Sequence, residues 1–427
     1  MKTLKVGMLG CGNVGSQIAR LLVANKADLA SRAGAQLELV KVAVKDIKAK
    51  RDGIATSLLT DDPYSVVNDP EIDLIIEVIG GISPAKELIL AAFKNGKSVV
   101  TANKALLAKE GAALYQAAGE ANVDLYYEAA VAGAIPILRP LRESLVGDHV
   151  TRIMGIVNGT TNYILTKMDE SGTAFADALK QAQELGFAEA DPTADVEGID
   201  ASDKAAILAG LAFHSRVTDK DVYREGITKI TATDVKVAKA MDMVIKLLAI
   251  TELTASGEIS VRVHPALISR THPLASVRES FNAVFVEAQS AGQMMFYGKG
   301  AGGEPTASAV LGDLVAIARH KVLGGIGPKE SDYASLKIAP MGETKTRYLI
   351  RLNVADKPGV LESVAHVFAS HSVSIQTVRQ TGAGDKAELI IMTHTSTESA
   401  LSATVKELGK LPAVTDVASV LRVEGAI

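Results

Sequence analysis

A glycine turn between an apolar strand pattern and an amphipathic helix pattern constrains the fold of this chain more than any other feature. The turn, G-C-G-N-V-G, spans residues 10–15 and follows directly on an apolar run. In such a turn Gly10 allows the tight bend, Gly12 lets the backbone approach a pyrophosphate, and Gly15 lets the helix and strand pack closely. A helix predicted over 16–25 would direct its N-terminal N–H groups at the phosphates. We therefore predict a bound dinucleotide; the alternative is an ordinary turn that holds no ligand.

Strand and helix patterns alternate through the first third of the chain. Further strands are predicted at 37–44, 72–79, 97–101 and 123–128. Ser83 and Pro84 are predicted to be the N-cap and first-turn proline of a helix that ends near Gly96. Alternation at this spacing predicts a parallel, doubly wound α/β sheet with helices on both faces.

The pattern changes after residue 133, where longer strands and helices of α+β type follow. Strands are predicted at 152–157, 258–264 and 283–288, and helices at 173–185, 200–214 and 232–249. A loop is predicted at 298–303. The apolar helix predicted at 307–323 is expected to return and pack on the first domain.

A polar connector leads to a small C-terminal unit with the order βαββαβ. Its predicted elements are strand 347–354, helix 358–370, strand 373–380, strand 386–394, helix 397–409 and strand 414–424. The predicted domains are 1–133 with a return segment 302–325, then 134–301, a linker 326–346, and 347–427.

Composition excludes several classes of partner. The net charge of −4, the absence of Trp and the low aromatic content give no basis for nucleic-acid or anionic-membrane binding. Charges interrupt the apolar runs before they reach membrane-spanning length, and the N-terminus lacks the pattern of a cleavable signal. Cys11 is the only cysteine, so no internal disulfide can form. We expect a soluble protein in a reducing cytoplasm.

The residue after the second predicted strand bears on the type of nucleotide. A carboxylate there would bind a ribose 2′-hydroxyl, whereas a cation suits a 2′-phosphate. Lys45 occupies this place and favours NADP, although Asp46 could serve NAD and Lys45 could be a solvated loop residue. The segment from Thr101 to Lys104 follows another strand. It is therefore expected at the carboxyl edge of the sheet, where ligands bind.

Residues 186–204 hold six carboxylates and end on Lys204. Six acids so close together cannot all be buried without cationic partners, so the segment indicates a site for a small zwitterion. Asp200 and Lys204 are four residues apart in a helical pattern and share one face. The alternative is a surface ion pair worth about 0.5 kcal/mol. A buried amine beside acids could instead carry a proton during hydride chemistry.

Cysteine and histidine usage narrows the chemistry. Oxidation of an aldehyde to an acyl product needs a thiolate nucleophile, yet Cys11 lies inside the glycine turn. No pair of histidines is accompanied by a pair of cysteines in zinc-ligand spacing or lies in an H-E-x-x-H motif. The sequence therefore favours a metal-free alcohol/carbonyl redox reaction that uses lysines.

Several motifs, in this order, resemble one enzyme family. They are the glycine turn, T-A-N-K at 101–104, E-A-A-V-A-G-A-I-P at 128–136, G-I-V-N-G-T-T-N-Y-I-L at 155–165, the carboxylate segment and Y-G-K-G-A-G-G-E-P-T-A at 297–307. Over its whole length the chain resembles homoserine dehydrogenase in the long bacterial form with a C-terminal ACT domain. The resemblance implies a Rossmann-type doubly wound nucleotide-binding domain, an α+β catalytic and dimerisation domain, and a ferredoxin-like ACT domain. It also implies NAD(P)-dependent interconversion of L-homoserine and L-aspartate 4-semialdehyde, on the route to threonine, methionine and isoleucine.

The resemblance assigns roles to residues of the carboxylate segment. Lys204 would be the proton donor in aldehyde reduction, and Lys104 a second lysine beside substrate and nicotinamide. Glu189 would bind the substrate ammonium. Asp195 and Asp200 would line and polarise the pocket.

The resemblance also implies contacts to the cofactor and a cation. Asn13 and Val14 would touch the cofactor, and Gly302 would lie near substrate or nicotinamide. A monovalent cation, usually sodium in this family, would be held near Glu128 and the backbone of Val131, Gly133 and Ile135. The alternative there is a plain turn.

The C-terminal unit contains D-K-P-G-V-L at 356–361, with the proline at a predicted helix start. Together with the βαββαβ order, this resembles an ACT domain, which binds amino acids where two copies pair. The resemblance implies threonine as effector, with Gly359 letting it approach the backbone, and a homodimer or homotetramer. The alternative is a structural appendage that binds nothing.

Two other functions stay open at this point. The first is an amino-acid dehydrogenase of the aspartate type, acting at a C–N bond, whose reverse reaction would depend on ammonia. The second is a non-catalytic amino-acid sensor, which would give no change in NAD(P)H absorbance with any hydroxy amino acid. The carboxylate–lysine segment speaks against a sensor, because a sensor needs no proton carrier.

Overall fold

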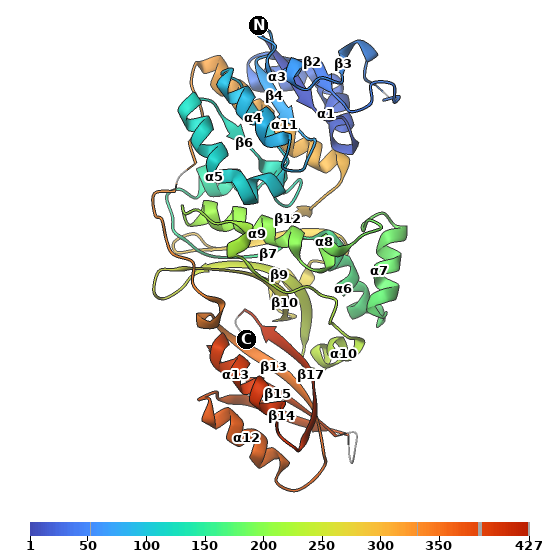
Figure 1. Ribbon diagram of the computed structural model, residues 1–427, viewed down its shortest axis with the longest axis vertical. Helices are drawn as coiled ribbons and strands as arrows, with labels where there is room; N and C mark the ends of the chain where they lie inside the picture. Colours follow the sequence, from blue (N-terminus) through green and yellow to red (C-terminus); the bar gives the residue numbers. More distant parts are fainter. Residues whose placement is uncertain (52, 331, 383–386, 426–427) are drawn as a thin grey trace. The chain divides into compact units, whose positions relative to one another are not determined.

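The computed structural model describes residues 1–51, 53–330, 332–382 and 387–425 (Figure 1). Its contacts divide the chain into two compact units. One comprises Met1–Gly159, Asp200–Val222 and Ser280–Leu336, and the other Thr160–Ile199, Tyr223–Glu279 and Lys337–Ile427. The predicted domain boundaries are a different division and stay predictions. Residue 386, where one predicted strand begins, lies outside the described residues. Within the described ranges, no helix is long and apolar enough to cross a bilayer.

The first unit is built around a parallel sheet in the order β3-β2-β1-β4-β5-β6. Its strands are β1 (Thr3–Leu9), β2 (Gln36–Ala43), β3 (Leu59–Thr60), β4 (Leu74–Glu77), β5 (Ser98–Thr101) and β6 (Leu125–Tyr126). The predicted parallel α/β sheet is confirmed. The two residues of β3 are too few to show a period, so this strand was not predicted.

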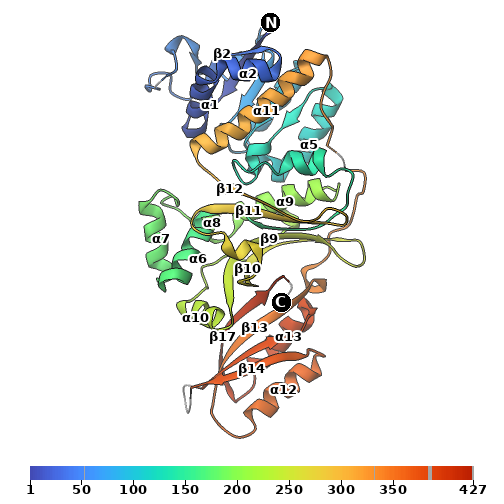
Figure 2. The same ribbon diagram turned by 180° about the vertical axis from the view of Figure 1, so that it is seen from behind.

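Helices cover both faces of this sheet (Figures 1 and 2). On one face lie α1 (Asn13–Ala24), α2 (Lys26–Ala33) and α11 (Gly303–Leu323); on the other lie α3 (Tyr64–Val67), α4 (Ala85–Lys94) and α5 (Lys104–Ala121). Alternate residues of a strand serve opposite faces. Leu74 and Ile76 belong to the core beneath α1 and α11, whereas Gly7 faces Val66 and Ile75 on the other side.

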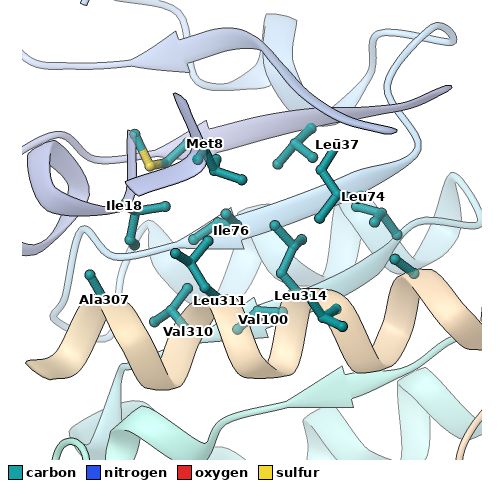
Figure 3. Close-up of a cluster of buried hydrophobic side chains, with 14 of the residues drawn as sticks. Met8, Ile18, Leu37, Leu74, Ile76, Val100, Ala307, Val310, Leu311 and Leu314 are labelled. Atoms are coloured by element: carbon teal, nitrogen blue, oxygen red, sulfur yellow. The ribbon is translucent and has the colours of Figure 1, made fainter. Parts of the chain in front are cut away.

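Helix α11 closes the first face although it comes from far along the chain. Ala307, Val310, Leu311 and Leu314 recur at helical spacing and pack with the sheet residue Ile76 in one buried cluster (Figure 3). Burying each of the larger side chains contributes roughly 1.5–3 kcal/mol. The expected return of this helix onto the nucleotide-binding sheet is confirmed.

The rest of the first unit contains an antiparallel group in the order β12-β11-β7. Its strands are β7 (Val150–Ile156), β11 (Phe281–Ala288) and β12 (Gly292–Lys299). Helix α9 (Ile199–Ala212) belongs to this unit from Asp200 onward. Short helical turns lie at Thr56–Leu58, Glu128–Ala130, Pro140–Ser144 and Asp219–Asp221.

The second unit combines helices with two parts of a sheet. Its helices before residue 337 are α6 (Gly159–Ser171), α7 (Phe175–Glu184), α8 (Thr193–Val196) and α10 (Ala232–Ala240), with a short turn at Pro273–Ser276. Its strands there are β8 (Tyr223–Arg224), β9 (Met243–Leu253) and β10 (Ile259–Ser269). Strand β10 pairs antiparallel with β9 and parallel with β8.

The C-terminal part of this unit has the predicted βαββαβ order. Its elements are β13 (Lys345–Val354), α12 (Val360–Ser370), β14 (Ile375–Thr381), β15 (Ala387–Thr393), α13 (Glu398–Leu408) and β17 (Val414–Val423), with short pieces at Met341–Glu343 and β16 (Ser396–Thr397). The strands lie in the order β17-β13-β15-β14 over a compact apolar core. Strand β17 also pairs in parallel with β10, so the C-terminal strands continue the sheet of β9 and β10.

One predicted helix is half wrong. The helix predicted over 232–249 ends at Ala240, Asp242 adopts a left-handed φ of 56°, and β9 follows. The first nine residues of β9 are buried on both faces. A continuous apolar run of this kind has no period that separates strand from helix.

Smaller differences concern helix starts and elements without a clear pattern. Helix α1 begins at Asn13, so the glycine turn runs into its first turn, and the N-cap of α4 is Pro84 rather than Ser83. Helix α6 was not predicted, because its polar residues are buried along with its apolar ones and its sequence shows no clear apolar stripe. Strand β12 extends to Lys299, which shortens the loop predicted at 298–303.

Candidate active site

The glycine turn lies where β1 ends and α1 begins. Gly10 has a φ of 99° and donates its N–H to the carbonyl of Ala43 at 2.9 Å. A Cβ at Gly15 would lie 2.5 Å from the Gly10 carbonyl oxygen, whereas a Cβ at Gly12 would meet nothing within 4 Å. The turn is therefore closed against the protein at Gly15 and open at Gly12, beside the N-terminus of a helix. This arrangement suits a bound pyrophosphate.

The N-terminus of α11 meets the N-terminus of α1 at this turn. Gly302 is the N-cap of α11 with a φ of 120°. A Cβ at Gly303 would lie 2.6 Å from Oδ1 of Asn13, which shows how closely the two helix starts approach. The structure thus brings Asn13 and Val14 of α1 together with Gly302, although nearly 290 residues separate them in the sequence.

Lys45 is exposed in the loop after β2. A hollow beside the glycine turn is lined by Cys11, Ser16, Gln17, Arg20, Ala49, Lys50 and Arg51. Lys45 does not line it. Arg51 donates from Nε to the carbonyl of Cys11 at 3.3 Å and from Nη1 to the carbonyl of Asp46 at 2.8 Å. The loop after β2 therefore presents Arg51 and Lys50 to this hollow.

The end of β5 is tied to the end of β4. The buried hydroxyl of Thr101 donates to Oε2 of Glu77 at 2.5 Å, and Oε1 of Glu77 accepts the N–H groups of Ile79 and Gly80. Asn103 then caps α5 by accepting the N–H of Leu106 at 3.2 Å. Thr101 thereby fixes the segment that starts α5, and Lys104 is the first residue of that helix.

The two predicted lysines meet at one carboxylate. Nζ of Lys204 lies 2.6 Å from Oδ2 of Asp200 and donates to the carbonyl of Val157 at 2.6 Å. Nζ of Lys104 lies 3.1 Å from Oδ1 of the same aspartate, and Asn158 donates to Oδ2 at 2.9 Å. The side chains of Lys204 and Asp200 are only 10% and 12% exposed, whereas that of Lys104 is 39% exposed. This Lys104–Asp200–Lys204 cluster is a buried ion pair extended by a second ammonium, not a surface pair.

Two aspartates on α9 have opposite electrostatics. Burial alone would raise the pKa of Asp200, but the ammonium groups of Lys204 and Lys104 and two hydrogen bonds lower it below its usual range. Burial, with the charges of Asp219 and Asp200 nearby, raises the pKa of Asp203 to about 6. Asp200 is therefore a fixed anion that holds two cations, whereas the raised pKa of Asp203, about 6, places its change of charge on the acid side of neutrality.

The other predicted substrate residues belong to the second unit. Glu189 is exposed in the loop between α7 and α8, where its carbonyl accepts from Nε2 of Gln183 at 3.1 Å. Asp195 is half-buried in α8, and its carbonyl accepts the N–H of Gly198 at 2.9 Å. Both lie on the chain segment that leads into α9, which carries Asp200 and Lys204.

The predicted cation turn is buried. The Glu128 carboxylate accepts the N–H groups of Ile137, Leu138 and Arg139 at 2.6–2.8 Å, so it is already satisfied by backbone donors. Gly133 has a φ of 57°, and a Cβ there would lie 2.5 Å from the carbonyl oxygen of Gly300. The buried carbonyls of Val131, Gly133 and Ile135 accept no hydrogen bond from any described residue.

Sequence analysis missed three groups of the site: Glu77, Asn158 and the Val157 carbonyl. Glu77 ends an apolar strand three residues before Gly80, and a lone acid in that position is a usable signal. Asn158 ends the run G-I-V-N, directly after a strand, which is a similar signal. The Val157 carbonyl carries no sequence signal, because every residue has such a group.

Comparison with known proteins places this geometry in a family. A family model described as "Homoserine dehydrogenase" matches residues 136–315, one described as "Homoserine dehydrogenase, NAD binding domain" matches 10–128, and an ACT-domain model matches 348–413. The homoserine dehydrogenase of Mycobacterium tuberculosis is 54% identical over 434 aligned residues, which cover 99% of this chain and 98% of that protein.

Solved structures agree over the same range. The crystal structure of a homoserine dehydrogenase from Thiobacillus denitrificans is 40% identical, with a TM-score of 0.94 over 99% of each chain. A hyperthermophilic archaeal homoserine dehydrogenase in complex with NADPH is 28% identical, with a TM-score of 0.65, and covers 77% of this chain and 100% of its own. With both the catalytic and the nucleotide-binding models matched, the chain belongs to the homoserine dehydrogenases, NAD(P)-dependent oxidoreductases that act on a CH–OH group.

Proposed function

We propose that Lys204 transfers the proton when this chain interconverts L-aspartate 4-semialdehyde and L-homoserine, with Asp200 and Lys104 fixing its charge and position. A lysine ammonium has three N–H donors. Val157 and Asp200 accept two of them at 2.6 Å each, and no other described residue accepts the third. This third donor is therefore available to the substrate oxygen, and it is the observation that carries the proposal.

The proton moves in step with charge on the substrate oxygen. When bound, the nicotinamide supplies the hydride in aldehyde reduction and accepts it in alcohol oxidation. In reduction the Lys204 ammonium donates to the carbonyl oxygen as negative charge develops there. In oxidation its neutral amine takes the hydroxyl proton. The Asp200 carboxylate stays ionised and stabilises the ammonium form.

Glu189, Asp195 and Asp200 are proposed to bind the substrate. Glu189 would pair with the substrate ammonium, and the two aspartates would line and polarise the pocket. The support is the chemistry of the segment, since a zwitterion supplies the cation that a run of carboxylates needs.

The proposed cofactor contacts follow the two helix starts and the adjoining strand ends. They are Gly10, Gly12, Asn13, Val14, Gly15, Lys45, Thr101, Lys104 and Gly302. We propose NADP as the preferred cofactor. The support is cationic: Lys45 lies in the loop after β2, and Arg20, Lys50 and Arg51 line the hollow beside the turn, where a 2′-phosphate would need them.

A monovalent cation, with sodium the proposed ion, fits the turn after Glu128. The buried carbonyls of Val131, Gly133 and Ile135 need a partner, and oxygen ligands suit a hard cation. Glu128 would lie near the cation, with its carboxylate held by the N–H groups of Ile137, Leu138 and Arg139. The cation would fix the turn that approaches Gly300.

The ACT domain is proposed to bind threonine where two copies pair, with Gly359 near the ligand, in a homodimer or homotetramer. The support is the matched ACT model and the left-handed φ of 86° at Gly359, directly before α12. The products would feed threonine, methionine and isoleucine synthesis. The domain division at residues 133, 301 and 346 is part of the same proposal.

Initial rates test these proposals together. We expect NADP reduction with L-homoserine in the absence of ammonia, faster than NAD reduction, and a lower rate with millimolar threonine. A reverse reaction that requires ammonia would indicate an amino-acid dehydrogenase. No threonine effect and no calorimetric heat of binding would contradict the effector assignment.

A further inference from the structure

A buried arginine near the C-terminus joins the ACT strands to the catalytic part of the second unit. Arg422 lies on β17 with its side chain only 8% exposed. Its Nη2 lies 2.5 Å from Oε1 of Glu398, the first residue of α13. Tyr348 on β13 donates its hydroxyl to the same glutamate at 2.6 Å. Within the ACT part, Arg422 is thus fixed by a helix start and a neighbouring strand.

The same guanidinium reaches out of the ACT part to Glu225. Its Nη1 lies 2.8 Å from Oε2 of Glu225, and its Nη2 lies 3.0 Å from Oε1. Nη2 also donates to the hydroxyl of Tyr223 at 3.1 Å, and that hydroxyl donates to Glu225. Two parallel N–H···O bonds fix direction as well as distance, so Glu225 is held in one orientation.

Glu225 is followed by a tight backbone contact with the segment before α9. The N–H of Ile227 donates to the carbonyl of Val196 at 2.8 Å. A Cβ at Gly226 would lie 2.3 Å from that carbonyl oxygen and 2.6 Å from Cα of Glu197, so only glycine fits there. The hydroxyl of Thr228 donates to Oε1 of Glu197 at 3.0 Å. The segment after β8, held by Arg422 at Glu225, therefore contacts residues 196–197 through its backbone and the Thr228 side chain.

This segment lies between the proposed substrate residues. Asp195 directly precedes Val196, and Asp200 follows Glu197 by three residues. We infer that Glu225, clamped by Arg422, is a positioning residue that holds the segment bearing Asp195 in place for homoserine. The inference rests on the proposed substrate role of Asp195. It also links the ACT part to the substrate segment through Glu225 and the residues that follow it.

A second buried ion pair supplies the matched control. Arg351 on β13 lies 2.6 Å from Oδ1 of Asp234 on α10, with side chains 9% and 1% exposed. This pair also joins an ACT strand to an element before residue 337. Neither Arg351 nor Asp234 has a recorded hydrogen bond or ion pair to residues 195–200. Loss of its charge should therefore leave homoserine binding unchanged.

The test compares Glu225→Gln, Asp234→Asn and Asp195→Asn in the full-length enzyme. Glu225→Gln removes the charge but keeps the shape, and Arg422 retains Glu398 as a partner. We expect it to raise the KM for homoserine three- to tenfold, with kcat and the KM for NADP changed less than twofold. Glu225→Asp keeps the charge and should therefore raise the KM for homoserine less than Glu225→Gln does. Asp234→Asn should leave all three parameters unchanged. Circular dichroism and the thermal midpoint confirm that each variant is folded.

The outcomes separate the inference from the proposal beneath it. If Asp195→Asn raises the KM for homoserine and Glu225→Gln does not, the positioning role is wrong while the substrate role stands. If Asp195→Asn leaves that KM unchanged, the substrate role falls and the inference with it. An equal rise in KM for Glu225→Gln and Asp234→Asn would also overturn the inference, because it would reflect a general loosening of the unit.

Discussion

The Lys104–Asp200–Lys204 cluster and the Arg422 cluster are both buried ion networks, but they use their donors differently. Lys204 is 10% exposed and Arg422 is 8% exposed, so burial does not separate them. Two described acceptors serve the three donors of Lys204. Arg422 instead engages acceptors through all three of its nitrogens. A buried cation with a donor facing a pocket can act on a ligand, whereas one that bridges carboxylates of separate elements holds those elements together.

Of the changes to these two networks, removal of Lys204 should have the largest effect, and it should act on catalysis. Lys204→Ala deletes the proposed proton carrier, and general acid–base catalysis contributes roughly 10²–10⁴-fold. We expect kcat for homoserine oxidation to fall by about 10³-fold. Cofactor affinity should stay within twofold, because the glycine turn is untouched. Steady-state rates and NADPH fluorescence titration measure the two quantities.

Residual turnover within tenfold of the native enzyme would show that another group carries the proton. Lys180→Ala is the matched control. Its side chain is 76% exposed and pairs weakly with Glu184 at 4.0 Å, so activity should not change.

Removing Arg422 should lower stability and, through Glu225, weaken homoserine binding, but should leave the proton-transfer step intact. Arg422→Met leaves the buried Glu398 carboxylate without its cation, and breaking a buried pair costs roughly 3–5 kcal/mol. Glu225 is 43% exposed and regains contact with water, so its own loss is small. We therefore expect Arg422→Met to lower the free energy of unfolding by about 3 kcal/mol. Denaturant unfolding monitored by circular dichroism measures the loss. Arg216→Met, which removes an exposed pair with Asp332, should cost less than about 0.5 kcal/mol. Equal losses of unfolding free energy in the two variants would show that the buried Arg422 ion pairs stabilise the fold no more than an exposed pair does.

Lys104 should have an intermediate effect. Its side chain is 39% exposed, and it touches the opposite oxygen of Asp200 from Lys204. We expect Lys104→Met to lower kcat/KM for homoserine about 10–100-fold, because it removes charge support but not the proton carrier. A pH–rate profile of the variant provides a second readout. A loss as large as that of Lys204→Ala would mean that the two lysines share the proton transfer.

The sequence alone predicted the Lys104–Asp200–Lys204 cluster, but not the contact between Arg422 and Glu225. Asp200 and Lys204 could be paired from their spacing, and Lys104 could be placed at the sheet edge from the strand before it. Both inferences depend on local patterns. Arg422 and Glu225 are about 200 residues apart in different elements, and neither lies in a motif. Their contact depends on the pairing of β17 with β10, which no local pattern specifies.

The same limit explains the errors in the fold. The βαββαβ unit and the glycine turn alternate strands and helices with clear turns between them, and both were predicted correctly. Most residues of strand β9 and helix α6 are buried, and in α6 the buried residues include Thr160, Asn162 and Asp169, so neither sequence separates an apolar face from a polar one. Tertiary burial, not local preference, decides their structure.

The smallest expected effect concerns Asp203, on the same helix as the lysine cluster. Its pKa is raised from an ordinary 3.8 to about 6, because burial and the charges of Asp219 and Asp200 outweigh Lys104 and Lys109. Between these two pH values the folded state holds the proton more tightly than the unfolded state. The free energy of unfolding therefore falls as pH rises through this window, and the penalty is complete above pH 6. Asp203→Asn should stabilise the enzyme by about 1 kcal/mol at pH 7.5 and by much less at pH 4.5.

Asp200→Asn should instead destabilise the enzyme at pH 7.5, since the Asp200 carboxylate supports two ammonium groups. Thermal unfolding at both pH values measures the difference, and a stabilisation by Asp203→Asn that does not depend on pH would show that the carboxyl does not titrate in this range.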